Sequence, residues 1–125
     1  MISPNLDSEG VPPMAVDADN FHKVCAKATI HQIGTPRHGI ITKRSRLEGG
    51  IAGFEEGHTV LGYFTDNPIL EKPFYMARYN TEGREQYGWF GTSPVAEIWP
   101  IEAGFTFVTH NSVYTLEFTP DPLNI

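Results

Sequence analysis

The pattern of apolar and polar positions along this chain predicts a series of short β-strands. Over residues 114–118 the apolar side chains of Tyr114, Leu116 and Phe118 take every second position, with polar residues between them. Such a segment turns one face to a core and the other to water, as strands of antiparallel sheets do. Segments rich in apolar, β-branched or aromatic residues predict further strands at residues 39–42, 59–64, 74–79, 86–90, 94–99 and 105–109.

One segment near the N-terminus has the spacing of a helix instead. Its apolar residues recur at intervals of three and four, as on one face of a helix: Phe21, Val24, Cys25 and Ala28. Asp17 or Asp19 is available as the N-cap, so we expect a helix of about three turns. The same stretch also alternates, and a strand over residues 27–33 is the alternative.

Together these elements predict an α+β domain, mainly antiparallel β, with one N-terminal helix against a small bent sheet or barrel-like domain. An all-β domain is the alternative if the helix is a strand. The 125 residues fit one domain, which we place at residues 17–118. The proline-containing segments on either side predict a flexible arm at residues 1–16 and, at residues 119–125, a tail that leaves the last strand.

The cellular location can be predicted from what the sequence lacks. It has no apolar run near the ~20 residues that cross a bilayer, and its first residues do not have the pattern of a secretory signal. Cys25 is the single cysteine, which fits a reducing compartment. We therefore expect a cytoplasmic protein with no membrane contact.

Charge is distributed unevenly along the chain. The formal net charge is −6, yet residues 20–47 contain no acidic residue. The basic residues of this segment are Lys23, Lys27, Arg37, Lys43, Arg44 and Arg46. They predict either solvated side chains facing different ways or a basic edge that receives an anionic ligand or the acidic half of a second subunit.

Arg44 and Arg46 form the most concentrated part of this segment. In an extended strand two residues apart share a face, so the two guanidinium groups could clamp a phosphate or carboxylate, with Arg37 close by. The alternative is a charged edge strand that protects the sheet from unwanted pairing.

A second candidate site is a polar pocket beside two aromatic residues, Trp89 and Tyr114. The hydroxyl and amide side chains that would bind a small ligand there are Thr92, Ser93, Asn111 and Ser112. The structural alternative is that these groups satisfy the backbone of a bent β ladder.

Familiar catalytic and metal-binding patterns are not found. The five histidines have no H-E-x-x-H or H-x-x-x-H spacing, and no second cysteine accompanies Cys25. No G-x-S-x-G elbow or phosphate-binding glycine motif occurs. We therefore predict no catalytic residue, no metal and no cofactor.

Two segments of the C-terminal half resemble a known group of proteins. They are T-S-P-V-A-E-I at residues 92–98 and V-T-H-N-S-V-Y-T-L-E-F at residues 108–118. The pair is similar to the C-terminal half of small accessory proteins carried by mobile DNA, such as phage, plasmids and integron gene cassettes. The resemblance covers residues 89–118 only, and it implies a small β-rich accessory protein without assigning any activity.

We therefore expect a non-enzymatic binding or adaptor protein that forms a homo-oligomer. The aromatic content of 12% is high for so small a domain, so some of these residues should reach an interface. One alternative is a binding protein, or minor enzyme, for an anionic or nucleotide-like small molecule. A nucleic-acid-associated protein is a weaker alternative, because a net charge of −6 repels phosphate.

Overall fold

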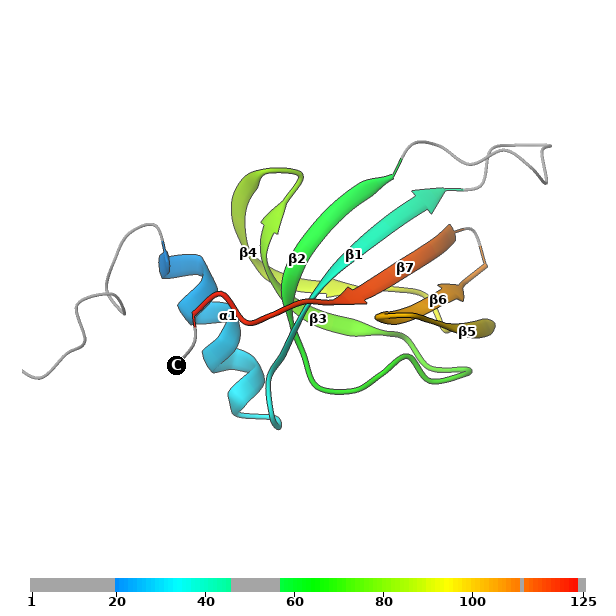
Figure 1. Ribbon diagram of the computed structural model, residues 1–125, viewed down its shortest axis with the longest axis horizontal. Coiled ribbons are helices and arrows are strands. Elements are labelled where there is room, and N and C mark those ends of the chain that lie inside the picture. The colour runs from blue at the N-terminus through cyan, green and yellow to red at the C-terminus, as the bar shows by residue number, and fades with distance from the viewer. Residues whose placement is uncertain (1–19, 46–56, 111, 124–125) are drawn as a thin grey trace, which may run out of the picture.

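One helix and seven strands make up the fold in the computed structural model, which describes residues 20–45, 57–110 and 112–123 (Figure 1). The elements are α1 (Phe21–His31), β1 (Arg37–Ser45), β2 (His58–Phe64), β3 (Tyr75–Thr81), β4 (Arg84–Gly91), β5 (Glu97–Ile101), β6 (Gly104–Val108) and β7 (Ser112–Phe118). The predicted α+β class with one N-terminal helix is confirmed. The alternative strand over residues 27–33 is wrong.

Some predictions concern residues outside the described ranges. The predicted arm at residues 1–16 and the predicted caps Asp17 and Asp19 are among them. The described helix has Asn20 at its N-cap position, without a side-chain hydrogen bond to the helix.

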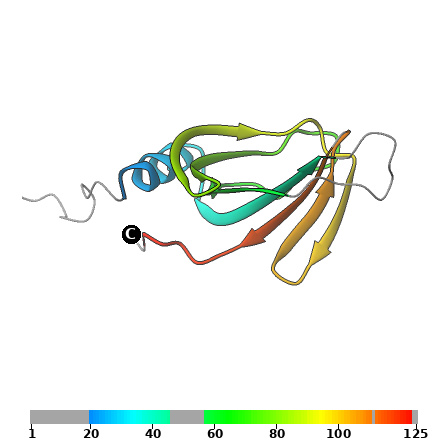
Figure 2. The same cartoon turned by 90° about the horizontal axis from the view of Figure 1, so that it is seen from above.

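The strands form one antiparallel sheet in the order β4-β3-β2-β1-β7-β6-β5. Every pairing is antiparallel, and six pairings separate β4 from β5, so these two edge strands run in the same direction. The chain passes from one edge to the other through residues 92–96, while the sheet curls (Figure 2). A bridge between Leu70 and Val95 ties this connection to the β2–β3 loop. The sheet is bent but not closed, because β4 and β5 do not pair.

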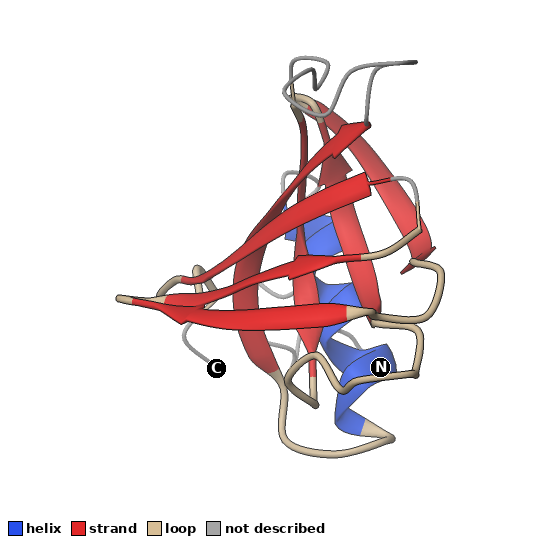
Figure 3. Ribbon diagram, turned by 90° about the vertical axis from the view of Figure 1, so that its right-hand side faces the viewer, coloured by secondary structure: helices blue, strands red, loops and turns tan. Residues whose placement is uncertain are grey.

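The sheet curls (Figure 3), and its concave face encloses the main hydrophobic core. Its buried residues are Ile41, Val60, Phe64, Phe74, Met76, Val95, Phe107, Tyr114 and Leu116, with Phe90 and Ile98 packed against them. Residues from every strand meet here because the curl brings the two ends of the sheet together. For example, Phe107 and Tyr114 lie opposite each other in β6 and β7, and their ring centroids stack 5.0 Å apart.

The convex face is covered by α1 over β2, β3 and β4 (Figure 1). A second buried cluster forms there from Ala26, Ile30, Tyr63, Ala77, Tyr79 and Leu123. The predicted apolar face of the helix was wrong: Phe21 and Ala28 are exposed, whereas Ala26 and Ile30 are buried.

Two lysines explain this different orientation of α1. The ammonium group of Lys23 lies 5.7 Å from the ring centroid of Tyr79, and that of Lys27 lies 6.0 Å from the centroid of Tyr63. A lysine packs its aliphatic stem on apolar surface while its ammonium group stays near a polar partner or an aromatic face. The side of α1 that faces the sheet therefore contains residues that look polar in the sequence.

Gly104, at the start of β6, is a position where only glycine fits. Its φ is +157°, and an added Cβ would lie 1.8 Å from the carbonyl oxygen of Leu116. We expect Gly104→Ala to lower the free energy of unfolding by about 3 kcal/mol, because backbone of β7 would have to move. Urea unfolding followed by tryptophan fluorescence measures this change.

Gly91→Ala is the matched control. An added Cβ at Gly91 meets only the ring of Tyr75, which is largely exposed and can move aside. An equal loss of stability in both variants would contradict the assignment of Gly104 as the close-packed position.

Candidate functional site

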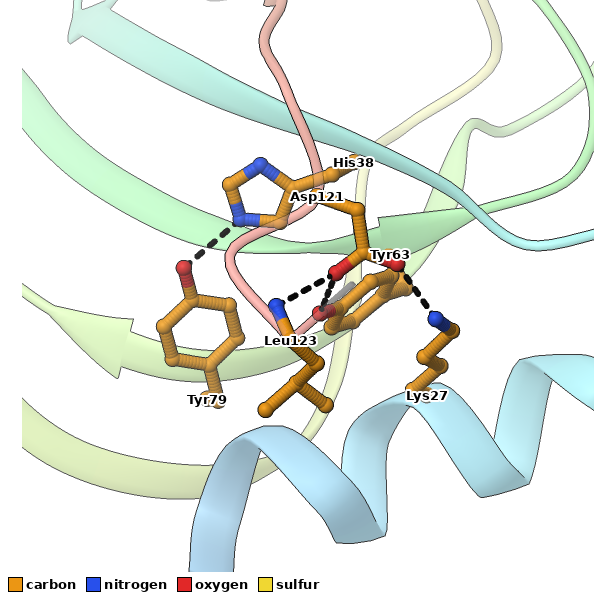
Figure 4. A network of polar contacts seen from close by, with 6 residues as sticks. All are labelled: Lys27, His38, Tyr63, Tyr79, Asp121 and Leu123. Atoms are coloured by element: carbon orange, nitrogen blue, oxygen red, sulfur yellow. Dashed lines mark hydrogen bonds and ion pairs between the residues drawn. The ribbon is translucent and has the colours of Figure 1, made fainter. Parts of the chain in front are cut away.

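A polar network lies between α1 and the convex face of the sheet (Figure 4). His38 of β1 is buried, and its Nε2 is 2.6 Å from the hydroxyl of Tyr79 on β3. Its Nδ1 is 2.5 Å from the hydroxyl of Thr119, just after β7. Both ring nitrogens of His38 are therefore hydrogen-bonded within the protein.

Asp121 forms the other half of the network. The hydroxyl of Tyr63 donates to Asp121 Oδ1 over 2.6 Å, and the backbone N–H of Leu123 donates to the same oxygen over 2.9 Å. Lys27 of α1 forms an ion pair with Oδ2 of Asp121. The ring of His38 packs edge-on against Tyr63, with centroids 5.1 Å apart, and so joins the two halves.

Burial and charge shift the pKa values of these groups. Burial lowers the pKa of His38, which outweighs the opposing effect of the Asp121 carboxylate. Burial likewise raises the pKa of Tyr79 to about 12 and, with the hydrogen bond to Asp121, raises the pKa of Tyr63. Burial alone would raise the pKa of Asp121, but the hydrogen bonds from Lys27, Tyr63 and Leu123 outweigh it and lower that pKa.

This arrangement suits a structural clamp better than acid–base catalysis. The raised pKa values keep both phenols protonated at neutral pH, and the histidine has no nitrogen left for a substrate. The network instead holds residues 119–123 against α1 and the sheet, where Leu123 is buried. The sequence predicts that the chain leaves the last strand after Phe118, but these residues pack back onto the convex face.

An apolar groove lies beside the C-terminal end of α1. It has a volume of about 700 Å³. Its lining comes from α1, the connection after it, the β2–β3 loop, β3 and β4: Ile30, Ile33, Thr65, Asp66, Asn67, Ile69, Lys72, Pro73, Phe74, Tyr75 and Trp89. Tyr75 is 58% exposed and Trp89 is 52% exposed, which is unusual for large aromatic side chains.

The positions of Tyr75 and Trp89 follow from strand register. Tyr75 pairs with Gly91, and Ala77 pairs with Trp89, so the two aromatic residues are diagonal neighbours on the convex face. Gly91 leaves room for the ring of Tyr75, since an added Cβ there would lie 2.8 Å from that ring. Of the residues predicted from the sequence to bind a ligand, Trp89 therefore does line a groove.

Thr92 and Ser93 lie in the connection after β4 and do not line that groove. The hydroxyl of Thr92 accepts a hydrogen bond from the N–H of Phe74 over 3.0 Å and donates to the carbonyl of Ser93 over 2.7 Å. The side chain of Thr92 thus satisfies backbone groups of the bent sheet. Ser93 is exposed.

Ser112 and Tyr114 lie on the opposite face from Trp89. Both are buried, and Tyr114 belongs to the concave core. Burial raises the pKa of Tyr114, while hydrogen bonds with Ser112 and Thr109 partly oppose the shift. Since Trp89 faces the convex side, the structure does not bring it together with Tyr114 in one pocket.

The predicted arginine clamp is only partly described. Arg44 is exposed and pairs with Val113, on the opposite face of β1 from Ile41. Arg46 and Asn111 lie outside the described residues. Arg37 is at the other end of β1, where its guanidinium lies 4.8 Å from the ring centroid of Phe64 and donates to the carbonyl of Thr65.

Sequence reasoning missed the polar network altogether. The side chains that bond to one another in it are separated by 41 to 94 positions, for example Lys27 and Asp121. The one sequence signal was the pair of polar residues, Thr119 and Asp121, next to the prolines of the predicted tail.

Within residues 20–45, 57–110 and 112–123, no group of three His, Cys, Asp or Glu residues could hold a metal ion. In the same ranges, no helix has both the length and the apolar character needed to cross a bilayer.

Comparisons of the chain with protein-family models, with curated proteins and with solved structures gave no match. The resemblance of residues 89–118 to accessory proteins of mobile DNA therefore stays a prediction.

Asp121→Asn tests the clamp. We expect this variant to lose about 1–2 kcal/mol of unfolding free energy at pH 7, because it weakens the ion pair with Lys27. The pKa of Asp121 is lowered in the folded state, so its contribution is present above the ordinary value of 3.8 and is lost as pH falls through the folded value. Urea unfolding should thus show a smaller gap between wild type and variant at pH 3 than at pH 7. Glu102→Gln, at an exposed carboxylate between β5 and β6, is the control.

His38→Gln tests the buried histidine. Burial lowers the pKa of His38 in the folded state, so as pH falls below the ordinary value of 6.5 the unfolded chain binds more protons and stability falls. We expect wild type to be less stable at pH 5.5 than at pH 7.5, and His38→Gln to show a smaller difference. His110→Gln, at an exposed histidine, should keep the wild-type difference. An unchanged pH dependence in His38→Gln would contradict this role.

Proposed function

We propose that the protein is a non-enzymatic binding module that associates with a second copy of itself through β4 and the adjoining apolar groove. The observation that carries the proposal is the gathering of exposed aromatic side chains on this edge. Tyr75, Tyr87 and Trp89 are all more than 40% exposed and belong to the last two strands on one side of the sheet. Exposed patches of this kind mark interaction surfaces.

The edge strand itself favours a second copy as the partner. Among the described residues β4 pairs only with β3, so the backbone groups on its outer side are open to a further strand. Two copies of β4 can pair antiparallel about a two-fold axis, which is the commonest symmetry of homodimers. The other edge, β5, is shorter and contains Pro100, which lacks the N–H that a paired strand needs.

Charge at the groove also favours self-association. Asp66 and Lys72 both line the groove, so its rim carries both signs. In a two-fold contact, Asp66 of one copy can face Lys72 of the other, and the surface is then complementary to itself. Two copies that each carry a net charge of −6 repel each other. The paired opposite charges at the groove would offset part of that repulsion.

The cellular setting belongs to the same proposal. The single Cys25 and the resemblance of residues 89–118 support a small accessory protein of mobile DNA that works in the cytoplasm. Such a protein would act by binding rather than by chemistry of its own.

Sedimentation velocity at increasing protein concentration tests the proposal. Wild type should shift from monomer to dimer, and Trp89→Ala should weaken association at least tenfold, because it removes a central aromatic contact. Trp99→Ala is the matched control: Trp99 is similarly exposed but lies on β5. It should associate like wild type.

Exchanging the charges of Asp66 and Lys72 tests the proposed two-fold contact. Asp66→Lys should weaken association, and adding Lys72→Asp to it should restore association, since the exchanged pair is again complementary. Wild type that stays monomeric up to its solubility limit would overturn the proposal. So would an equal effect of Trp89→Ala and Trp99→Ala.

A further inference from the structure

We propose that the concave face of the sheet binds a small organic anion, a carboxylate or phosphate ester, at Arg78. Arg78 follows Met76 by two positions in β3, and Met76 is part of the concave core. Side chains two residues apart in a strand share a face, so Arg78 also leaves β3 on the concave side. This site lies on the face opposite the groove and is independent of self-association.

Two glycines flank Arg78 on this face. Gly62 of β2 and Gly88 of β4 are its direct neighbours across the sheet. A Cβ added at Gly88 would lie 3.8 Å from Nη2 and 3.9 Å from Nε of Arg78, which places the guanidinium over Gly88. No side chain of the paired positions therefore stands beside the guanidinium.

Arg78 has a buried hydrogen-bond donor without a partner. Its Nε is buried and has no hydrogen-bond partner, and the same is true of the hydroxyl of Thr81. Thr81 pairs with Val60 of the concave core, so it faces the same side as Arg78. Within the described residues, no ion pair involves Arg78. Buried polar atoms without partners are rare, and a missing ligand is one of their standard explanations.

Other cations share the concave face. Lys43 pairs with Tyr114 of the concave core, and Arg84 pairs with Thr81, so both face the same side as Arg78. Three positive side chains from β1, β3 and β4 thus face one side of a sheet whose chain is acidic overall. Their summed potential favours an anion there.

Glu85 and Glu117 face the other way, and Glu82, in the turn before β4, is in hydrogen-bond contact with His58. Glu85 pairs with Asn80, which pairs with Leu61 of the convex cluster. Glu117 pairs with Ile40, whose neighbour Ile41 is in the concave core. Because neighbouring residues of a strand point to opposite faces, neither carboxylate is placed to neutralise Arg78.

The chemistry of the surroundings limits the class of ligand. A guanidinium is a planar fork that binds a carboxylate or phosphate through two parallel hydrogen bonds. Arg78 is only partly buried, and Met76 and Phe90, which share its face on β3 and β4, are apolar. An oxyanion attached to an apolar or aromatic body matches both features better than an inorganic ion does.

Isothermal titration calorimetry with three probes, namely inorganic phosphate, phenyl phosphate and benzoate, tests the site. We expect at least one aromatic anion to bind at least tenfold more tightly than inorganic phosphate. Arg78→Gln should weaken that binding at least tenfold, and Arg78→Lys should weaken it less, because lysine keeps the charge but loses the fork. Arg44→Gln, at a cation on the convex face, is the matched control and should bind within twofold of wild type.

A stability measurement provides a second readout. If the partner of Arg78 is a ligand, its charge is unpaired and partly desolvated in the ligand-free protein. Arg78→Met should therefore leave the urea midpoint of unfolding unchanged or raise it. A clear fall in the midpoint would show that the chain itself satisfies Arg78, and would overturn the proposal. So would the absence of binding by all three probes, or equal losses in Arg78→Gln and Arg44→Gln. If Arg78→Gln does not fold, Lys43→Gln should still weaken the aromatic anion severalfold, and unchanged affinity there would count against the site.

Discussion

The pairing of β1 with both β2 and β7 joins two antiparallel meanders into one sheet, and the other features of the molecule depend on that junction. Ile41, near the middle of β1, pairs with Val60 on one side and Leu116 on the other, and all three are buried in the concave core. Because the short connection at residues 92–96 must link the two edges, the sheet has to curl. The curl in turn creates a concave face that is filled by apolar side chains and a convex face that needs a separate cover.

The convex face obtains this cover from two segments that are far apart in sequence. Helix α1 supplies Ala26 and Ile30, and the segment after β7 supplies Leu123. Asp121 joins the two, because it accepts hydrogen bonds from Tyr63 of the sheet and pairs with Lys27 of the helix. A buried polar network of this kind is costly unless every member is satisfied. Here His38 is bonded to Tyr79 and Thr119, while Asp121 is bonded to Tyr63, Leu123 and Lys27. Its contribution is therefore to fix where the helix and the C-terminal segment lie.

The two faces also divide the candidate binding surfaces. Exposed aromatic residues collect on the convex side of the β4 edge, where α1 ends and no described element extends the sheet. Cations collect on the concave side, where Arg78 lies between Gly62 and Gly88. Successive side chains along a strand point to opposite faces of the sheet, so adjacent residues such as Ala77 and Arg78 can belong to different surfaces. The two proposed binding surfaces therefore lie on opposite faces of one sheet.

The sequence by itself determined the elements and the fold class. Alternation predicted the last strand, segments rich in apolar, β-branched and aromatic residues predicted the others, and spacing near Phe21 predicted the helix, because all these signals are local. The tertiary structure alone decided which side of α1 is buried, since Lys23 and Lys27 pack on tyrosines that come from distant strands. It also separated Trp89 from Tyr114, because strand register places them on opposite faces, and it brought Asp121 back to the helix. Faces, register and long-range polar partners depend on which strands become neighbours, and no local pattern in the sequence contains that information.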